Sequence, residues 1–212
     1  MAVAEVLREK YKKEDLHLYY FGPERYNEES LRINNIQFVK IPAGKKRVYS
    51  SAQNIFDYFK VMAGIFWSMM KLPIYYPDVI FSKGGFTAYP VLFAARILRI
   101  PVVEHDSDTV PGRVTISFAK YAKLIGVGWF EGGKYLTEKT KIPEEKIMDT
   151  GVPTRRVMNP MYKKEHLQKQ FSFINKSLPL ISILGGSQGS VTINDAIIAG
   201  LPYILPFAHS IS

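Results

Sequence analysis

The sequence predicts an α/β protein with a parallel sheet, organised as one Rossmann-like domain and the beginning of a second. Short apolar runs alternate with helical patterns of ten or more residues through the middle of the chain. A polar stretch bordered by prolines follows, and after it an apolar run enters a glycine-rich turn. With 212 residues, 47% of them hydrophobic, the chain is long enough for one full domain and part of another.

The first elements are a helix, two strands and a long helix. Apolar side chains near the amino terminus fall on one helical face, with charged residues around the remainder. Strands are expected at 16–22 and 36–43, with a polar, helical interval between them. No proline interrupts the apolar and aromatic pattern from Ser50 to Leu72, which predicts a helix that ends before Pro73.

From residue 78 onward the alternation becomes regular. The expected order is strand 78–83, helix 89–99, strand 101–106, helix 114–123, strand 124–129, helix 134–139 and strand 146–151. Strands joined by helices of this length indicate parallel pairing with right-handed crossovers.

The domain organisation follows from these patterns. Residues 1–152 form the first domain, 153–177 the connection between domains, and 178–212 the start of the second domain, with a strand at 179–184 and a helix at 191–201. The pattern opens on a helix, where a doubly wound domain normally opens on a strand. We therefore expect the first domain to lack its first strand and the second to be truncated.

Composition excludes several classes of protein. A formal charge of +9 favours an anionic partner, which nucleic acid, a phospholipid surface or a phosphorylated substrate would each satisfy. The chain has no cysteine and four scattered histidines, so we expect no metal ion and no cofactor. The amino terminus has no signal-peptide pattern, and the apolar run at 61–70 is about half of the roughly 20 residues that a transmembrane helix needs. We expect a cytoplasmic protein.

The strongest local motif is the glycine-rich turn at 185–190. The sequence ISILGGSQGS carries an apolar strand into Gly186, Ser187, Gln188 and Gly189, and helix-forming residues follow. Free backbone amides at a helix start, together with a hydroxyl, can bind a diphosphate. The alternative is a plain turn that holds no ligand.

A second pair of glycines follows the strand at 78–83, in the sequence SKGGF. Gly84 and Gly85 would let the backbone approach a ligand at the carboxyl edge of the sheet. The alternative, which the residues by themselves favour, is a tight turn between strand and helix.

Acidic residues and a histidine gather at the end of the next strand, in EHDSDTVPGR at 104–113. Glu104, His105, Asp106 and Asp108 suit proton transfer or hydroxyl recognition. They also suit a capped turn, with Asp108 or the next residue as N-cap and Pro111 in the first helical turn. The two interpretations are compatible.

The fourth motif is TGVPTRR at 150–156, where a strand end is followed by Arg155 and Arg156. Arginine at a domain junction suits a diphosphate or a carboxylate, although most such arginines are solvated. The carboxyl ends of parallel strands share one edge of the sheet, so these motifs are expected to face a common cleft.

Together, GGF at 84–86, HDSD with PG at 105–112, TGVPTR at 150–155 and GGSQGS at 185–190 resemble the successive motifs of MurG-type N-acetylglucosaminyltransferases. The resemblance runs from about Met1 to Leu201. It implies a GT-B fold and inverting transfer of N-acetylglucosamine from UDP-N-acetylglucosamine to an undecaprenyl-pyrophosphoryl muramyl-peptide in peptidoglycan synthesis. It also implies a peripheral position on the inner face of the cell membrane.

The resemblance assigns residues to each substrate. It places Asp108, Arg155, Gly186, Ser187, Gln188 and Gly189 at the donor, and Gly84, Gly85, Phe86 and Thr87 at the acceptor diphosphate. His105 and Asp106 are the candidates for acid–base or orienting roles. Asp108 and Val152 stand where family members commonly have asparagine.

The family's glycine-rich loop with a histidine and its uracil-binding portion have no counterpart in these 212 residues, so we expect the chain by itself to be inactive. An alternative is a non-catalytic half that binds the acceptor or the membrane and needs a partner chain. A nucleic-acid-binding module is the weakest interpretation, because no known recognition motif is present. We expect no nucleic acid partner.

Membrane contact has independent support in the residues. Lys45, Lys46 and Arg47 precede a helix that carries Phe66 and Trp67. A basic edge beside an aromatic, apolar face suits an anionic bilayer surface. The alternative is that these aromatic side chains fill the core.

Overall fold

The computed structural model describes residues 1–25, 27–44, 53–154, 180–183, 185, 189–207 and 209–211. The chain divides into two compact units, Met1–Met158 and Asn159–Ser212. The predicted domain limits at 152 and 178 remain a prediction, because the residues between the described parts of the two units lie outside the structure's description.

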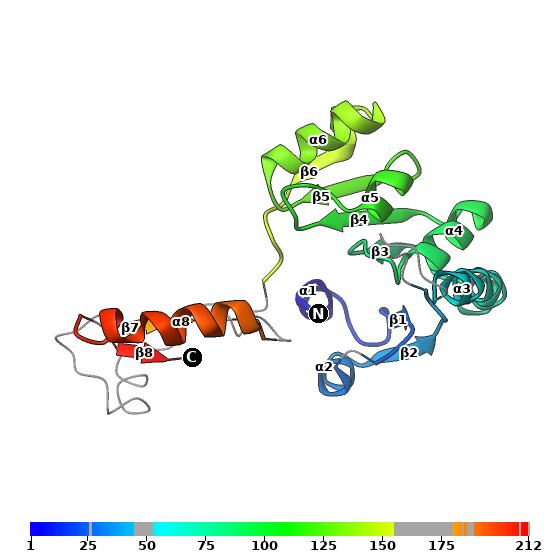
Figure 1. The fold of residues 1–212 in the computed structure, drawn as a ribbon. Helices are drawn as coiled ribbons and strands as arrows, with labels where there is room; N and C mark the ends of the chain where they lie inside the picture. Colours follow the sequence, from blue (N-terminus) through cyan, green and yellow to red (C-terminus); the bar gives the residue numbers. More distant parts are fainter. Residues whose placement is uncertain are drawn as a thin grey trace. The chain divides into compact units, whose positions relative to one another are not determined.

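The first unit alternates helices and strands, as predicted (Figure 1). Its elements are α1 (Ala2–Lys10), β1 (Leu18–Gly22), α2 (Glu28–Ile33), β2 (Ile36–Lys40), α3 (Gln53–Tyr75), β3 (Ile80–Ser82), α4 (Tyr89–Leu98), β4 (Val102–Asp106), α5 (Arg113–Phe118), β5 (Leu124–Val127), α6 (Phe130–Thr140), a 3₁₀ turn (Glu144–Lys146) and β6 (Ile147–Asp149). Every strand pair in the unit is parallel, which confirms the predicted α/β class.

The strands of this unit form two sheets, β1-β2 and β3-β4-β5-β6. The amide of Ile41 donates to the Gly22 carbonyl (2.9 Å) and the amide of Ile80 to the Pro101 carbonyl (2.9 Å), so β1 and β3 each use one edge for their partner strand. Among the described strands, nothing pairs with their other edges.

One apolar core connects the two sheets. Side chains of β2, α3, α4 and β4 are buried in it, and Tyr19 and Phe21 of β1 and Ile80 of β3 pack against it. The rings of Tyr19 and Phe21 both meet the ring of Tyr75 edge-on, at centroid distances of 4.8 and 5.6 Å. Helices α3 and α4 therefore hold the two sheets in one body.

Three helix boundaries differ from the prediction. Helix α3 continues past Pro73, because proline removes one backbone hydrogen bond in the last turn while the amide of Tyr76 still bonds the Leu72 carbonyl (2.8 Å). Tyr76, at φ 44°, then ends the helix. Helix α5 stops at Phe118, and α6 already begins at Phe130.

The second unit holds β7 (Leu180–Ser182), α8 (Val191–Ile204) and β8 (His209–Ile211), with β7 and β8 parallel. The hydroxyl of Ser190 caps α8 by accepting a hydrogen bond from the amide of Ile193 (3.3 Å). Strand β8 is absent from the predicted pattern. A strand followed by a helix agrees with the expected start of a second Rossmann-like domain.

Candidate functional site

Three of the predicted loops meet at the carboxyl edge of the four-stranded sheet. They follow β3, β4 and β6, which run parallel with β5 in the order β3-β4-β5-β6. Backbone bonds connect their ends: the amide of Gly128 donates to the Asp106 carbonyl (2.8 Å), and the amide of Thr150 to the Val127 carbonyl (3.0 Å). Parallel pairing therefore brings residues 82–86, 105–108 and 149–152 to one edge.

Asp106 organises the loop that follows β4. One carboxylate oxygen accepts the amide of Asp108 (3.0 Å), and the other accepts the amide of Gly112 (2.9 Å) and the hydroxyl of Thr115 (2.7 Å). The side chain is buried. A carboxylate with three donors in a buried site is a structural anchor, which favours an orienting role over proton transfer.

This anchor replaces the predicted helix cap. The N-cap of α5 is Gly112, without a side-chain cap, so the expected capping by Asp108 and the expected place of Pro111 in the first turn are wrong. The carboxylate of Asp106 takes the cap's role by accepting the Gly112 amide. Asp108 is exposed, and its charge acts on the nearby ammonium group of Lys83.

His105 connects two loops through both ring nitrogens. Nδ1 lies 2.9 Å from the ammonium nitrogen of Lys83, and Nε2 lies 3.0 Å from the Gly151 carbonyl oxygen. Lys83 also donates to the Ser107 hydroxyl. Burial is the main cause that lowers the pKa of His105. The hydrogen bond to the Gly151 carbonyl opposes it by raising the pKa, the charge of Lys83 lowers the pKa further, and the charge of Asp106 raises it. Neutral His105, with both ring nitrogens hydrogen-bonded, is better suited to connect the two loops than to act as an acid.

The paired glycines after β3 are required by their backbone geometry. Gly84 and Gly85 have φ of 71° and 79°, in the left-handed region that favours glycine. A Cβ on Gly84 would lie 2.8 Å from the Thr115 hydroxyl. The amide of Gly84 donates to the Ser82 hydroxyl (3.0 Å). The turn is thus packed against the Asp106 anchor on one side, and Gly85 and Phe86 are exposed on the other.

Other glycines let the loops approach one another. A Cβ on Gly126 would lie 3.0 Å from both the His105 ring and the Thr150 hydroxyl, and one on Gly128 would lie 2.9 Å from Val152. The indole of Trp129 donates to the Ser107 carbonyl (3.1 Å). Side chains at these glycines would force the loops apart.

Glu104 lies in β4, fully buried, between its register partners Ser82 on β3 and Ile125 on β5. Neither of its carboxylate oxygens has a hydrogen-bond partner in the described part of the chain. Burial first, and the charge of Asp106 second, raise the pKa of Glu104 to about 8. It therefore stays protonated and uncharged at neutral pH, and its burial leaves it no access to a ligand.

Several predicted residues lie outside the described part of the chain. They are Lys45, Lys46, Arg47, Arg155, Gly186, Ser187 and Gln188. Gly189 is described, at φ 69°, but belongs to the second unit. The structure brings together Gly84, Gly85, Phe86, Thr87, His105, Asp106 and Asp108 at the carboxyl edge of the sheet.

A metal site receives no support from these residues. The expectation of no metal assumed that the chain has no Asp-x-Asp pair, which is wrong because Asp106 and Asp108 form one. The carboxylate of Asp106, however, is taken by three donors. Within the described ranges, no three His, Cys, Asp or Glu side chains gather as metal ligands.

Helix α3 has one buried and one exposed face. Gly64, Ser68 and Leu72 are buried against the rest of the unit. The opposite face exposes Phe66 (61%) and Trp67 (47%), together with Phe59, Met62, Met70 and Ile74. The alternative that these aromatic side chains fill the core is therefore wrong. None of the helices in the described residues combines the length and apolar character needed to span a bilayer.

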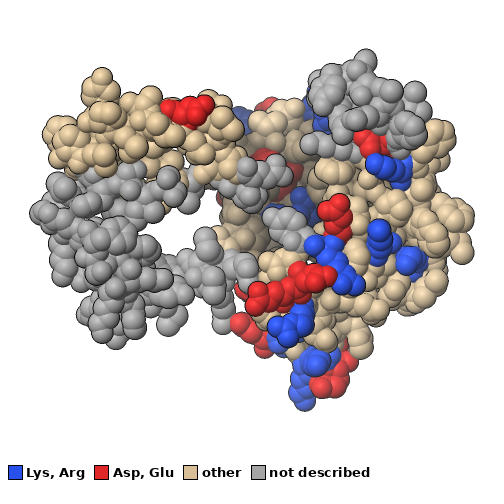
Figure 2. Space-filling view, turned by 60° about the horizontal axis from the view of Figure 1, so that its bottom comes forward, with Lys and Arg blue, Asp and Glu red and all other residues tan. Residues whose placement is uncertain are grey.

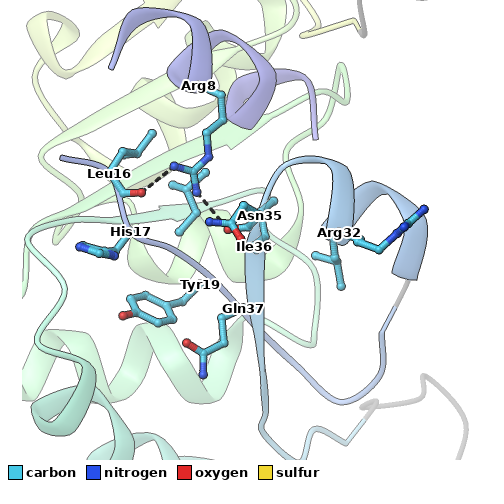
Figure 3. Close-up of a pocket in the computed structure, with 10 residues that line it drawn as sticks. Arg8, Leu16, His17, Tyr19, Arg32, Asn35, Ile36 and Gln37 are labelled. Atoms are coloured by element: carbon cyan, nitrogen blue, oxygen red, sulfur yellow. Dashed lines mark hydrogen bonds between the residues drawn. The ribbon is translucent and has the colours of Figure 1, made fainter. Parts of the chain in front are cut away.

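A hollow of about 260 Å³ lies at the opposite, amino-terminal ends of β1 and β2 (Figure 3). Its arginine, Arg8 of α1, donates to the carbonyls of Leu16 (2.6 Å), Asn34 (2.9 Å) and Asn35 (2.9 Å). The guanidinium group thus joins α1 to both strand starts. Because three donors of Arg8 bond backbone carbonyls, this arginine has a structural role; Arg32 and His17 also line the hollow.

Sequence reasoning overlooked Lys83, Thr115 and Gly151. Lys83 sits inside the quoted SKGGF motif, but a lysine beside glycines has no distinctive pattern, and its contact with His105 joins residues 22 positions apart. Thr115 bonds Asp106 from the first turns of α5. Gly151 acts through its carbonyl, which no sequence pattern reveals.

Comparison with known proteins places these observations in a family. The model of the "Glycosyltransferase family 28 N-terminal domain" matches residues 1–127. The UDP-N-acetylglucosamine--N-acetylmuramyl-(pentapeptide) pyrophosphoryl-undecaprenol N-acetylglucosamine transferase of Clostridium botulinum (strain Alaska E43 / Type E3) is 37% identical over 195 residues, which are 92% of this chain and 52% of the relative. Its namesake from Borreliella afzelii (strain PKo) is 34% identical over 186 residues, 85% of this chain and 48% of the relative.

Two solved structures share the fold. The crystal structure of Acinetobacter baumannii MurG superposes with a TM-score of 0.59 at 20% identity, over 94% of this chain and 49% of that chain. The UDP-GlcNAc 2-epimerase from Neisseria meningitidis bound to UDP-GlcNAc gives 0.61 at 15% identity, over 99% and 61%. At these identities the likeness concerns the fold, and it agrees with the expected GT-B architecture. The chain spans about half the length of the curated relatives that it matches.

Proposed function

The chain belongs to glycosyltransferase family 28, and on this premise we propose that it is the acceptor-side part of an N-acetylglucosaminyltransferase of peptidoglycan synthesis. The donor would be UDP-N-acetylglucosamine and the acceptor an undecaprenyl-pyrophosphoryl muramyl-peptide, the substrates after which its relatives are named. The observation that supports this most is the meeting of the loops after β3, β4 and β6 at one sheet edge.

The acceptor diphosphate would bind the turn at Gly84 and Gly85. Positive φ at both glycines shapes the turn. The Gly84 amide bonds the Ser82 hydroxyl, so the exposed Gly85 is the glycine whose backbone amide would meet the anion. Phe86 and Thr87 follow at the start of the segment that leads into α4. The Asp106 anchor fixes the buried side of the turn through Thr115, so the amide needs little reorganisation when the anion binds.

The transfer itself would be a single displacement. The acceptor hydroxyl oxygen forms a bond to the anomeric carbon of the donor sugar, while the bond from that carbon to the diphosphate oxygen breaks. UDP leaves with the electron pair, and a base takes the hydroxyl proton. Arg155, Gly186, Ser187, Gln188 and Gly189 are proposed to hold the donor, with Asp108 near it; His105 and Asp106 are proposed to orient the loops.

Activity of these 212 residues by themselves is expected to be slight. The described part of the second unit contributes two short strands and α8, whereas transfer requires donor and acceptor held within reaction distance. The alternative is a non-catalytic acceptor-binding or membrane-docking half that needs a partner chain.

One experiment separates these proposals. Radiolabelled UDP-N-acetylglucosamine and vesicles with the lipid-linked acceptor are given to the 212-residue chain and to a longer protein that contains it. We expect turnover only in the longer protein, and large losses there on Arg155→Ala or Ser187→Ala. Unchanged turnover in both variants would refute the donor assignment. Donor binding that appears only after a second polypeptide is added would favour the alternative.

The exposed face of α3 is proposed to contact the membrane, on the cytoplasmic side. Phe66, Trp67 and Met70 are exposed on it, and Lys71 lies over the Trp67 ring at 5.8 Å. Apolar side chains beside cations suit the interface of an anionic bilayer, and Lys45, Lys46 and Arg47 would add to the attraction.

Vesicle sedimentation tests this surface. The double change of Phe66 and Trp67 to Ser should weaken binding to anionic vesicles by at least tenfold, because two interfacial aromatic side chains are lost. Phe130→Ser, which changes an equally exposed aromatic on α6, is the matched control. Equal binding by both variants would contradict the assignment to α3.

A nucleic acid partner is not proposed. On the face drawn in Figure 2, Lys and Arg side chains lie among Asp and Glu side chains, without one continuous basic area. Oligonucleotide binding depends on such an area and weakens steeply with salt.

A further inference from the structure

The amino group of Lys83 occupies the centre of the three-loop edge. It lies 2.9 Å from Nδ1 of His105 and donates to the hydroxyl of Ser107, although much of the lysine side chain is exposed. Asp106 and Asp108 act on it by charge, while burial is the main cause that lowers its pKa. Lys83 is not among the residues proposed to bind the donor, the acceptor or the membrane.

The contacts of His105 fix where its proton lies. A carbonyl oxygen accepts hydrogen bonds and cannot donate, so Nε2 must carry the hydrogen that bonds the Gly151 carbonyl at 3.0 Å. A charged lysine donates and cannot accept, so Nδ1 must be the unprotonated, accepting nitrogen. The two partners together select one neutral tautomer of the ring.

The two contacts of His105 connect the loop after β3 with the loop after β6. Lys83 belongs to the loop after β3, His105 lies in β4, and Gly151 follows β6. Gly151 has φ 63° and leads directly into the segment with Arg155. The chain Lys83–His105–Gly151 thus crosses the sheet edge from the proposed acceptor turn to the start of the connection between the two units.

We propose that Lys83 is a positioning residue: its ammonium group holds His105 in the neutral Nε2–H tautomer, and through it fixes the Gly151 loop relative to the acceptor turn. The consequence for acceptor binding rests on the proposed function, whereas the tautomer does not. If Lys83 were only a solvent-exposed surface residue, its removal would change neither the tautomer nor the pKa of His105.

Nuclear magnetic resonance of ¹⁵N-histidine in the 212-residue chain measures the tautomer directly. The wild-type chain should show His105 with one pyridine-like nitrogen, Nδ1, and one pyrrole-like nitrogen, Nε2, and no exchange between them. Lys83→Met removes charge and donor at nearly constant length and should give mixed tautomers. It should also raise the pKa of His105, because the charge of Lys83 lowers it. Lys83→Arg, which keeps a cationic donor, should restore the single tautomer.

Lys134→Met is the matched control, because Lys134 is an exposed lysine of α6 away from the histidine. It should leave the His105 signals unchanged. A single Nε2–H tautomer with an unchanged pKa in Lys83→Met would overturn the proposal, as would wild-type signals that show the proton on Nδ1. If Lys83→Met does not fold, the tautomer of His105 in the wild type and in Lys83→Arg decides the question.

A second arm tests the consequence for the ligand. The same variants are sedimented with vesicles that contain the lipid-linked muramyl-peptide acceptor, and with vesicles that lack it. We expect the acceptor-dependent part of binding to fall at least tenfold in Lys83→Met and to recover in Lys83→Arg. If no variant shows acceptor-dependent binding while the tautomer responds as stated, the proposed function fails and the positioning role stands. If acceptor binding is present but the His105 tautomer is the same in the wild type and in Lys83→Met, the positioning role fails.

Discussion

Glu104 gives the sharpest prediction about stability, because its carboxyl group is fully buried without a partner in the described structure. Its pKa rises from 4.5 to about 8, a difference of about 3.5 units. At about 1.4 kcal/mol per unit, ionising this group in the folded chain costs about 5 kcal/mol more than in the unfolded chain. That cost is a large part of the stability of an ordinary domain.

The sign follows from the raised pKa. The folded state binds the Glu104 proton more tightly than the unfolded state, so the contribution to stability is complete below pH 4.5 and is lost as the pH rises toward 8. In Glu104→Gln the group no longer titrates. The difference in unfolding free energy, wild type minus variant, should therefore fall by about 3 kcal/mol between pH 5 and pH 7.5.

Urea unfolding followed by tryptophan fluorescence measures this difference, since Trp67 and Trp129 both belong to the first unit. Comparison with Glu104→Gln cancels the titration of His105, which both proteins share. Parallel stability profiles of the two proteins across this pH range would refute the reasoning, because they would mean that the Glu104 carboxyl group is solvated or paired.

Four further substitutions, three in the site and one at the start of α2, are measured by urea unfolding. Gly84→Ala should destabilise the chain by about 1–2 kcal/mol from backbone strain and further from its Cβ at 2.8 Å from the Thr115 hydroxyl, whereas Gly85→Ala, with no described atom within 4 Å, should show the strain alone. Thr115→Val leaves the buried Asp106 carboxylate without its 2.7 Å donor and should cost about 1–3 kcal/mol; an effect below 0.5 kcal/mol would contradict the anchor. Asn27→Ala removes the cap of α2 and should lower the free energy of unfolding by about 1 kcal/mol. An unchanged free energy of unfolding would contradict this prediction.

Much of the candidate site could be predicted from the sequence. Glycines after apolar runs marked the ends of β3 and β6, and the group of His105, Asp106 and Asp108 marked the end of β4. The rule that parallel strands end at a shared edge was sufficient to bring these loops together. The motif at 185–190 and Arg155 stay predictions, since they lie outside the described residues.

Element boundaries were less predictable, because they depend on contacts between elements. Pro73 was expected to end α3, yet the helix bonds onward to Tyr76 while Leu72 is buried in the core. The N-cap of α5 was expected at Asp108 or Thr109, but the cap is Gly112, and the carboxylate that bonds its amide comes from Asp106, six residues away. In both cases a tertiary contact outweighed a local preference.

The sequence by itself determined the α/β class, the order of the strands along the chain and the places where loops leave the sheet, because hydrophobic periodicity and glycine turns are local properties. Only the tertiary structure decided what each polar group does. Asp106 became an anchor, His105 a tether to Gly151, and Glu104 a buried neutral acid, because burial and partners from other strands set the protonation and hydrogen bonding of a side chain. The tertiary structure also exposes Phe66 on α3. The sequence pattern of this helix was compatible both with a buried aromatic face and with an exposed one.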